Sequence, residues 1–100
     1  MAITGPTFSF EAELFEADAE AAWVFVALPP ADADEIRDLV PRRPGFGSVK
    51  VIAKIKAVEW KTSIFPSKEA QSYLLPVKRS VRDSAEIDTG DRVWVTISLV

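Results

Sequence analysis

One stretch constrains the fold of this chain more than any other: residues 73–100, with the sequence YLLPVKRSVRDSAEIDTGDRVWVTISLV. Apolar residues at every fourth position predict a helix over residues 77–85, with Pro76 near its start, where a missing N–H group costs little. After a turn at Gly90, apolar and polar residues alternate over residues 92–99, which predicts a half-buried strand. We therefore expect a strand–helix–strand unit at this end of the chain.

A weak internal repeat indicates a second such unit in the first half of the chain. Residues 22–28 predict a strand, and their near-continuous apolar run predicts burial on both faces or a central place in the sheet. A proline pair ends this strand, and a helix follows over residues 32–40, capped by Asp32 or Asp34. Residues 49–57 then alternate between apolar side chains and lysines, as a strand would. Two similar units predict a barrel with approximate two-fold symmetry, its ends covered by the helices.

Three further strands complete the predicted barrel: residues 7–15, 60–65 and 71–75. The acidic residues 16–20 are expected to form a turn. The predicted fold class is mainly β, a small closed or double-split six-stranded β-barrel with pseudo-two-fold symmetry, capped by two short helices. A chain of 100 residues is long enough for one domain of this kind, so we expect residues 1–100 to be a single barrel domain.

The composition excludes most familiar catalytic chemistries. The chain has no Cys and no His, so it lacks a thiol nucleophile, an imidazole base and a Cys/His zinc site. If residues 60–65 and 71–75 form a hairpin, the hydroxyls of Ser63 and Tyr73 can face a common cleft. A serine nucleophile there needs a base, and only a lysine or a carboxylate is available, so a structural role for these hydroxyls is favoured. Two carboxylates at Asp88 and Asp91 make a weak cation site. We predict no catalytic residue, no metal and no cofactor.

Charge is distributed unevenly along the chain. Residues 1–40 carry nine acidic and one basic residue, residues 41–82 two acidic and ten basic, and residues 83–100 four acidic and one basic, so that −8 + 8 − 3 gives the net charge of −3. The basic middle indicates either strands that are complementary to the acidic ones or a patch that faces an anion. Complementary strands are the commoner explanation.

The predicted location is the cytoplasm. The N-terminal residues lack the basic and apolar regions of a signal peptide. No apolar run approaches the ~20 residues that a membrane-spanning helix needs.

Several motifs resemble one protein family. The segments WKTSIFP, YLLPVK and IDTGDRVWV, with FSFEAEL and WVFVALP nearer the N-terminus, resemble the bacterial domain of unknown function 1905. This resemblance implies a small double-split β-barrel capped by helices, in a family without an assigned activity. More loosely, L-P-x-K-x-x-V-R followed by I-x-x-G-D-x-V-x-V is similar to half of the swapped-hairpin barrel of AbrB- and MazE-type DNA-binding proteins. That likeness implies kinship of fold, which is weak evidence for function.

Four side chains are candidates for an anion-binding site: Lys61, Tyr73, Lys78 and Arg82. Lys78 and Arg82 are four residues apart on the predicted helix, so both cations can point the same way. The tight corner at Pro76 should bring Tyr73 near the helix start, whose free N–H groups also favour an anion. The alternative is that these groups only pair with carboxylates such as Glu59, Asp83 and Asp91. Trp23, Trp60 and Trp94 are expected in the core or at the barrel mouth, without forming an aromatic cage.

These observations favour a soluble, non-enzymatic barrel domain that binds a small anionic ligand or a protein partner, as a monomer or weak dimer. The alternative is an AbrB/MazE-like nucleic-acid-binding or antitoxin-type regulator. A sequence pI near 4.9 opposes strong binding to duplex DNA, which depends mainly on phosphate neutralisation.

Overall fold

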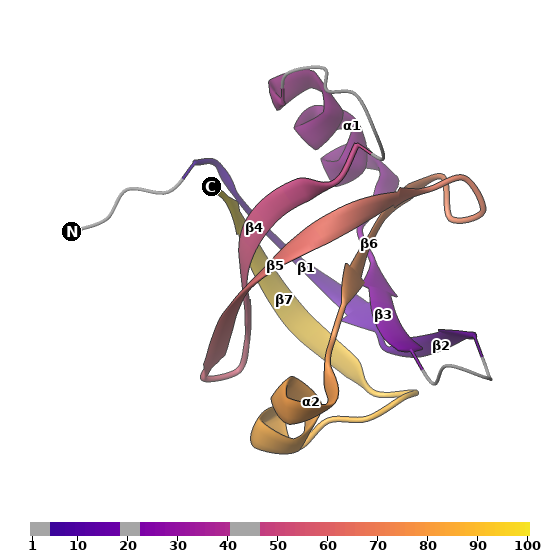
Figure 1. Cartoon of the computed structure of the whole chain (residues 1–100), viewed down its shortest axis with the longest axis vertical. Helices are drawn as coiled ribbons and strands as arrows, with labels where there is room; N and C mark the ends of the chain where they lie inside the picture. Colours follow the sequence, from indigo (N-terminus) through magenta and orange to yellow (C-terminus); the bar gives the residue numbers. More distant parts are fainter. Residues whose placement is uncertain (1–4, 19–22, 41–46) are drawn as a thin grey trace.

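The computed structural model describes residues 5–18, 23–40 and 47–100, where strands and helices follow one another largely in the predicted order (Figure 1). The elements are β1 (Thr7–Glu13), β2 (Phe15–Asp18), β3 (Trp23–Ala27), α1 (Pro30–Leu39), β4 (Val49–Ile55), β5 (Val58–Ser67), β6 (Ser72–Pro76), α2 (Arg79–Ala85) and β7 (Arg92–Leu99). The sheet order is β1-β7-β4-β5-β6-β3-β2, and every neighbouring pair is antiparallel.

The fold is mainly β, as predicted: a curled, half-barrel sheet of seven strands with two helices. Figure 1 shows α1 and α2 at opposite ends of the curled sheet, where α1 contacts β6 and α2 contacts β5. Both strand–helix–strand units are present, as β3–α1–β4 and β6–α2–β7.

The sheet has seven strands where six were predicted, because part of the expected acidic turn forms β2. β1 and β2 are consecutive and meet at Leu14, where the chain changes partner from β7 to β3. Leu14 donates its N–H to the carbonyl oxygen of Asp91 at 2.9 Å and accepts from the N–H of Gly90 at 2.8 Å. Backbone hydrogen bonds to β3 therefore form a strand in residues that were predicted to be a turn from their acidic side chains.

Alternation of side chains builds the core, as the sequence predicts. In β1, β4 and β7 every second residue is buried. The central members of this set are Phe10, Val51, Ala53, Ile55, Val95 and Ile97. β3 departs from its prediction: Val24 and Val26 are buried, whereas Trp23, Phe25 and Ala27 are only partly covered. Both helices lie at the ends of the sheet, so they leave the outer face of β3 without a covering layer.

Both helices begin elsewhere than predicted. α1 starts at Pro30, preceded by Pro29 as the N-cap, so the expected side-chain cap from Asp32 or Asp34 is wrong. Proline fits the first helical position because its missing N–H has no intrahelical partner there. α2 starts at Arg79, two residues later than predicted. No helix in the described part of the chain is long and apolar enough to cross a membrane.

The strand predicted over residues 49–57 ends two residues early, at a tight hairpin. β4 ends at Ile55, which pairs with Val58 across a two-residue turn. Lys56 adopts a φ of 55° there, although neither Gly nor Asn marks the turn. Its ammonium group donates to the carbonyl oxygen of Ala85 at 2.8 Å, which ties the hairpin to the end of α2.

Candidate functional site

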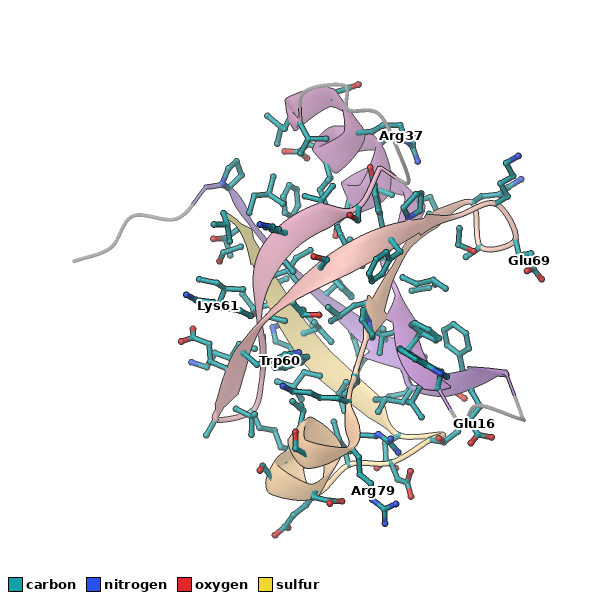
Figure 2. The ribbon with its side chains drawn as sticks, viewed as in Figure 1. Glu16, Arg37, Trp60, Lys61, Glu69 and Arg79 are labelled. Atoms are coloured by element: carbon teal, nitrogen blue, oxygen red, sulfur yellow. The ribbon has the colours of Figure 1, made fainter. Side chains whose placement is uncertain are left out.

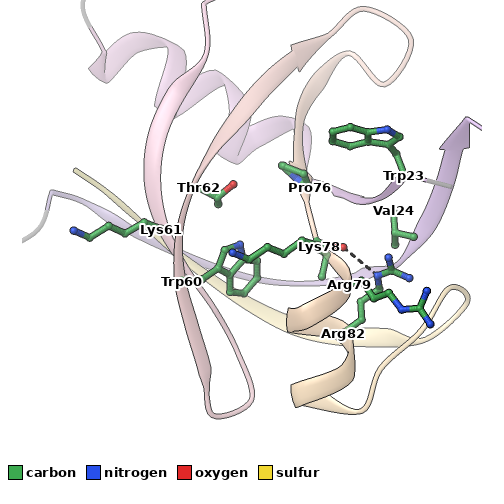
Figure 3. A pocket seen from close by; sticks show the side chains of 10 residues that line it. Trp23, Val24, Trp60, Lys61, Thr62, Pro76, Lys78, Arg79 and Arg82 are labelled. Atoms are coloured by element: carbon green, nitrogen blue, oxygen red, sulfur yellow. Dashed lines mark hydrogen bonds between the residues drawn. The ribbon is translucent and has the colours of Figure 1, made fainter. Parts of the chain in front are cut away.

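A pocket of about 410 Å³ opens beside α2, next to the segment where β6 passes into the helix (Figure 3). Its walls come from β3, from β5 and from this junction, which are far apart in sequence. The lining residues are Trp23, Val24, Trp60, Lys61, Thr62, Pro76, Val77, Lys78, Arg79 and Arg82. We call this space the basic pocket, because four of its lining residues are Lys or Arg and, within residues 5–18, 23–40 and 47–100, none is Asp or Glu.

The basic pocket exists because β5 changes partner along its length. β5 pairs with β4 over residues 58–64 but with β6 only over residues 65–67. β6 pairs with β3 up to Pro76, and the next residue continues along β3, with the N–H of Val77 donating to the carbonyl oxygen of Val24 at 2.9 Å. The start of β5 and the end of β6 therefore diverge, and the pocket lies between them.

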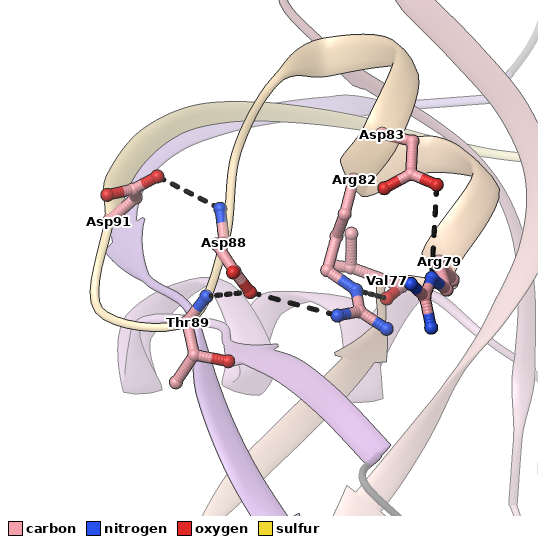
Figure 4. Close-up of polar contacts among 7 residues, drawn as sticks. All are labelled: Val77, Arg79, Arg82, Asp83, Asp88, Thr89 and Asp91. Atoms are coloured by element: carbon pink, nitrogen blue, oxygen red, sulfur yellow. Dashed lines mark hydrogen bonds and ion pairs between the residues drawn. The ribbon is translucent and has the colours of Figure 1, made fainter.

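Three cations of the basic pocket come from α2 and its N-cap residue. Lys78 and Arg79 are exposed, and the Nε of Arg79 lies 3.9 Å from the Oδ2 of Asp83. The side chain of Arg82 is only 19% exposed: its Nε donates to the carbonyl oxygen of Val77 at 3.1 Å, and its Nη1 lies 3.8 Å from the Oδ1 of Asp88 (Figure 4). Arg82 is thus held in a defined position, whereas Lys78 and Arg79 extend into solvent.

Lys61 was predicted to point its ammonium group at the site, and the structure directs it elsewhere. Only part of the residue lines the pocket, and its side chain points away from Trp60 and Lys78 (Figures 2 and 3). Successive side chains of a strand face opposite sides, and Lys61 pairs in register with Ile52 on the outer face of the sheet. Its neighbours Trp60 and Thr62 turn inward instead.

Tyr73 lies outside the basic pocket. It is 4% exposed, and the guanidinium carbon of Arg37, from α1, lies 5.9 Å from its ring centroid. Tyr73 is three residues from Pro76, about 10 Å along an extended strand, so it belongs to the α1 end of the sheet. Ser63 and Tyr73 lie on opposite faces of the hairpin, because Phe65 pairs with Leu74 and side chains alternate from there.

Two tryptophans of the basic pocket were not foreseen as site residues. Trp23 is 56% exposed, and its ring stacks on Phe25 with centroids 6.2 Å apart and planes 14° from parallel. Trp60 is partly buried and packs against the core. The two tryptophans are 37 positions apart on different strands, and only the tertiary fold brings them to one pocket. No local sequence pattern predicts that they line the same pocket. Arg79 and Thr62 are further members that the prediction missed.

A second basic surface lies on the outside of β4 and β7, lined by Lys54, Lys56, Arg92, Val93, Trp94 and Thr96. Its cations are largely engaged. The ammonium group of Lys56 binds the Ala85 carbonyl, and the Nη2 of Arg92 lies 3.3 Å from the Oε1 of Glu11. This surface has three cations, against four in the lining of the basic pocket, and serves as its control.

The carboxylates near the Gly90 turn accept hydrogen bonds from the backbone. The N–H of Asp88 donates to the Oδ2 of Asp91 at 2.9 Å, and the N–H of Thr89 donates to the Oδ1 of Asp88 at 2.7 Å (Figure 4). Gly90 adopts a φ of 95°, a conformation that glycine enters without steric cost. Among the described residues, no group of three potential metal ligands is present.

Comparison with known proteins supports the family resemblance. None of the curated proteins matches the chain. One family model matches residues 10–97, from β1 to β7, and thus includes every residue that lines the basic pocket. The chain belongs to the family described as Domain of unknown function (DUF1905).

Proposed function

We propose that this protein is a non-enzymatic binding domain that holds a small anion, a carboxylate or a phosphate, in the basic pocket. One observation carries the proposal. The chain has a net charge of −3, yet the described residues that line this pocket include four basic residues and no acidic one. Such local segregation of charge attracts an anion despite the acidic total.

Three of the four cations have a distinct part in this proposal, because the ammonium group of Lys61 points away from the pocket. Arg82 is pre-positioned by the Val77 carbonyl, and its planar guanidinium is suited to binding an oxyanion through parallel hydrogen bonds. Lys78 and Arg79 are exposed and close on the ligand from the helix, and the Thr62 hydroxyl is a further donor. Because two of the cations must be ordered on binding, we expect a bare anion to bind in the millimolar range, about −4 kcal/mol.

The lining itself supports a binding role over catalysis. The chain has no His and no Cys, and in the part of the pocket wall that the structure describes no carboxylate is present to accept a proton. Among these described lining residues the only hydroxyl is that of Thr62, which would depend on a lysine as its base.

The alternative function is nucleic-acid binding of the AbrB/MazE type. The observation in its favour is the symmetric pairing of the strands. The two strand–helix–strand units have matching partners. In one half β1 pairs with β7 and β2 pairs with β3; in the other half the start of β5 pairs with β4 and the end of β5 pairs with β6. We propose that β1 and β2 are two arms of one bent strand in a six-stranded double-split barrel with pseudo-two-fold symmetry. The net negative charge makes this function the weaker candidate.

Thermal unfolding with added anions tests the proposed function. Phosphate, acetate and citrate are titrated to millimolar concentration at constant ionic strength, because phosphate also stabilises proteins without binding a site. The Lys78→Ala/Arg79→Ala double variant removes two exposed cations, and Lys54→Ala/Arg92→Ala is the matched control on the second basic surface. We expect the anions to stabilise the wild type and the Lys54→Ala/Arg92→Ala control, but not the Lys78→Ala/Arg79→Ala variant. Equal stabilisation of all three proteins, or none, would exclude the site.

A further inference from the structure

We infer that the ligand of the basic pocket carries a planar aromatic ring next to its acidic group. This inference rests on the proposed function and names the ligand class more closely. It comes from the part of the pocket that the cations do not occupy, where the lining is aromatic and apolar: Trp23, Val24, Trp60, Pro76 and Val77.

Trp23 presents an indole that is both exposed and held in place. More than half of its surface is in contact with solvent, 56%, although indole is the largest apolar group that a chain can bury. One side of its ring stacks on Phe25, which in turn lies 6.3 Å from Phe15 between ring centroids. The row of three rings fixes the orientation of the indole, so a ligand that stacks on its open side has little side-chain motion to arrest.

Trp60 supplies the second aromatic surface. It comes from β5, whereas Trp23 comes from β3, and Pro76 lies between them in the close-up of the pocket (Figure 3). Trp60 packs against the hydrophobic core, which makes its ring a rigid part of the wall. The pocket therefore has an aromatic region contributed by two strands, adjoining a basic region contributed by α2.

The size of the pocket limits what it can hold. About 410 Å³ is in the lower part of the range of ~300–1,000 Å³ for small-molecule sites. This volume suits one molecule with one or two rings and an acidic group. An aryl carboxylate and a nucleoside monophosphate share this chemistry, and the experiment separates them.

Isothermal titration calorimetry with matched pairs of ligands provides the test. Each pair keeps the acid and differs by the ring: acetate and benzoate, methyl phosphate and phenyl phosphate, ribose 5-phosphate and adenosine 5′-monophosphate. Stacking of one ring on an aromatic side chain predicts that the ring-bearing member binds about five- to a hundred-fold more tightly. A preference confined to the benzoate pair identifies an aryl carboxylate, and one confined to the nucleotide pair identifies a nucleoside phosphate.

Variants assign the preference to the inferred surface. Trp23→Ala should reduce the ring preference at least several-fold and leave the affinity for the bare anion unchanged, since Trp23 carries no charge. Trp94→Ala is the matched control, because Trp94 is 63% exposed and lies on the second basic surface. In a Trp94→Phe background, the remaining fluorescence comes from the two pocket tryptophans, and ring-bearing ligands should quench it.

The outcomes separate this inference from the proposed function. Binding of bare anions with no gain from the ring overturns the inference and leaves the proposed function standing. Absence of binding by every probe overturns both. Binding of oligothymidylate with an affinity that rises with its length replaces the single-ligand pocket by a nucleic-acid strand site and also refutes the inference.

Discussion

Arg82 and Arg79 lie one turn apart on α2, and their different burial predicts that the same substitution affects stability to very different extents. Arg82 is 19% exposed, and its Nε donates to the carbonyl oxygen of Val77 across the junction of β6 with α2. Arg79 is 86% exposed, and its contact with Asp83 is 3.9 Å long. We expect Arg82→Ala to destabilise the fold and Arg79→Ala to leave it nearly unchanged.

The expected magnitude for Arg82→Ala comes from its two contacts. A hydrogen bond from a charged group to a partly buried carbonyl contributes about 1.5–3 kcal/mol to the free energy of unfolding. The pair with Asp88, whose side chain is 81% exposed, contributes at most about 0.5 kcal/mol. A loss of about 2–3 kcal/mol follows, and 2 kcal/mol alone lowers Tm by about 8–16 °C in a domain of this size. Arg79→Ala should stay within about 0.5 kcal/mol of the wild type.

Urea denaturation followed by circular dichroism measures both values, with the m-value as a check that the unfolded states are comparable. Arg82→Lys is the informative third variant, since it keeps the charge but lacks the rigid fork that reaches Val77. It should recover only part of the loss. If Arg82→Ala and Arg79→Ala fall within 0.5 kcal/mol of one another, the Val77 contact does not hold the junction, and Arg82 would be as mobile as its neighbours.

Three further predictions concern the turn, the core and nucleic acid. Gly90→Ala should destabilise by about 1–2 kcal/mol in thermal unfolding although its Cβ meets no atom within 4 Å, because the φ of 95° is strained for alanine; a neutral effect would contradict this account. Ile97→Ala, at a fully buried position in β7, should lower stability by about 2–5 kcal/mol in urea denaturation, and a loss below 1 kcal/mol would show that the core there collapses around the gap. Duplex DNA should bind weakly and without sequence preference in mobility-shift assays at physiological salt, and submicromolar, sequence-selective binding would refute this expectation.

Much of the fold was predictable from local patterns. Alternation of side chains located β1, β4 and β7, and the spacing of Val81 and Ala85 marked the buried side of α2. These patterns show which face of an element meets the core, because that property depends on the type of each successive residue. The prolines and glycines of the two strand–helix–strand units are likewise local signals, since each acts on the backbone at its own position.

Pairing decided what these patterns leave open. The acidic residues of β2 form a strand because β3 offers backbone partners, and Lys56 makes a tight turn because Ala85 binds its ammonium group. β3 has an exposed aromatic face because both helices lie at the ends of the sheet. None of these causes is local to the residues concerned.

The candidate site shows the same division. The sequence by itself placed Lys78 and Arg82 together, since positions four apart on a helix are neighbours whatever surrounds the helix. The directions of Lys61 and Tyr73 depend on strand register and on where β5 leaves β6, which spacing along the chain does not reveal. Trp23 and Trp60 line one pocket because β5 changes partner, which opens a space between strands that are distant in sequence. Local periodicity thus determines which side chains a single element presents together, and only tertiary pairing decides which elements share a pocket.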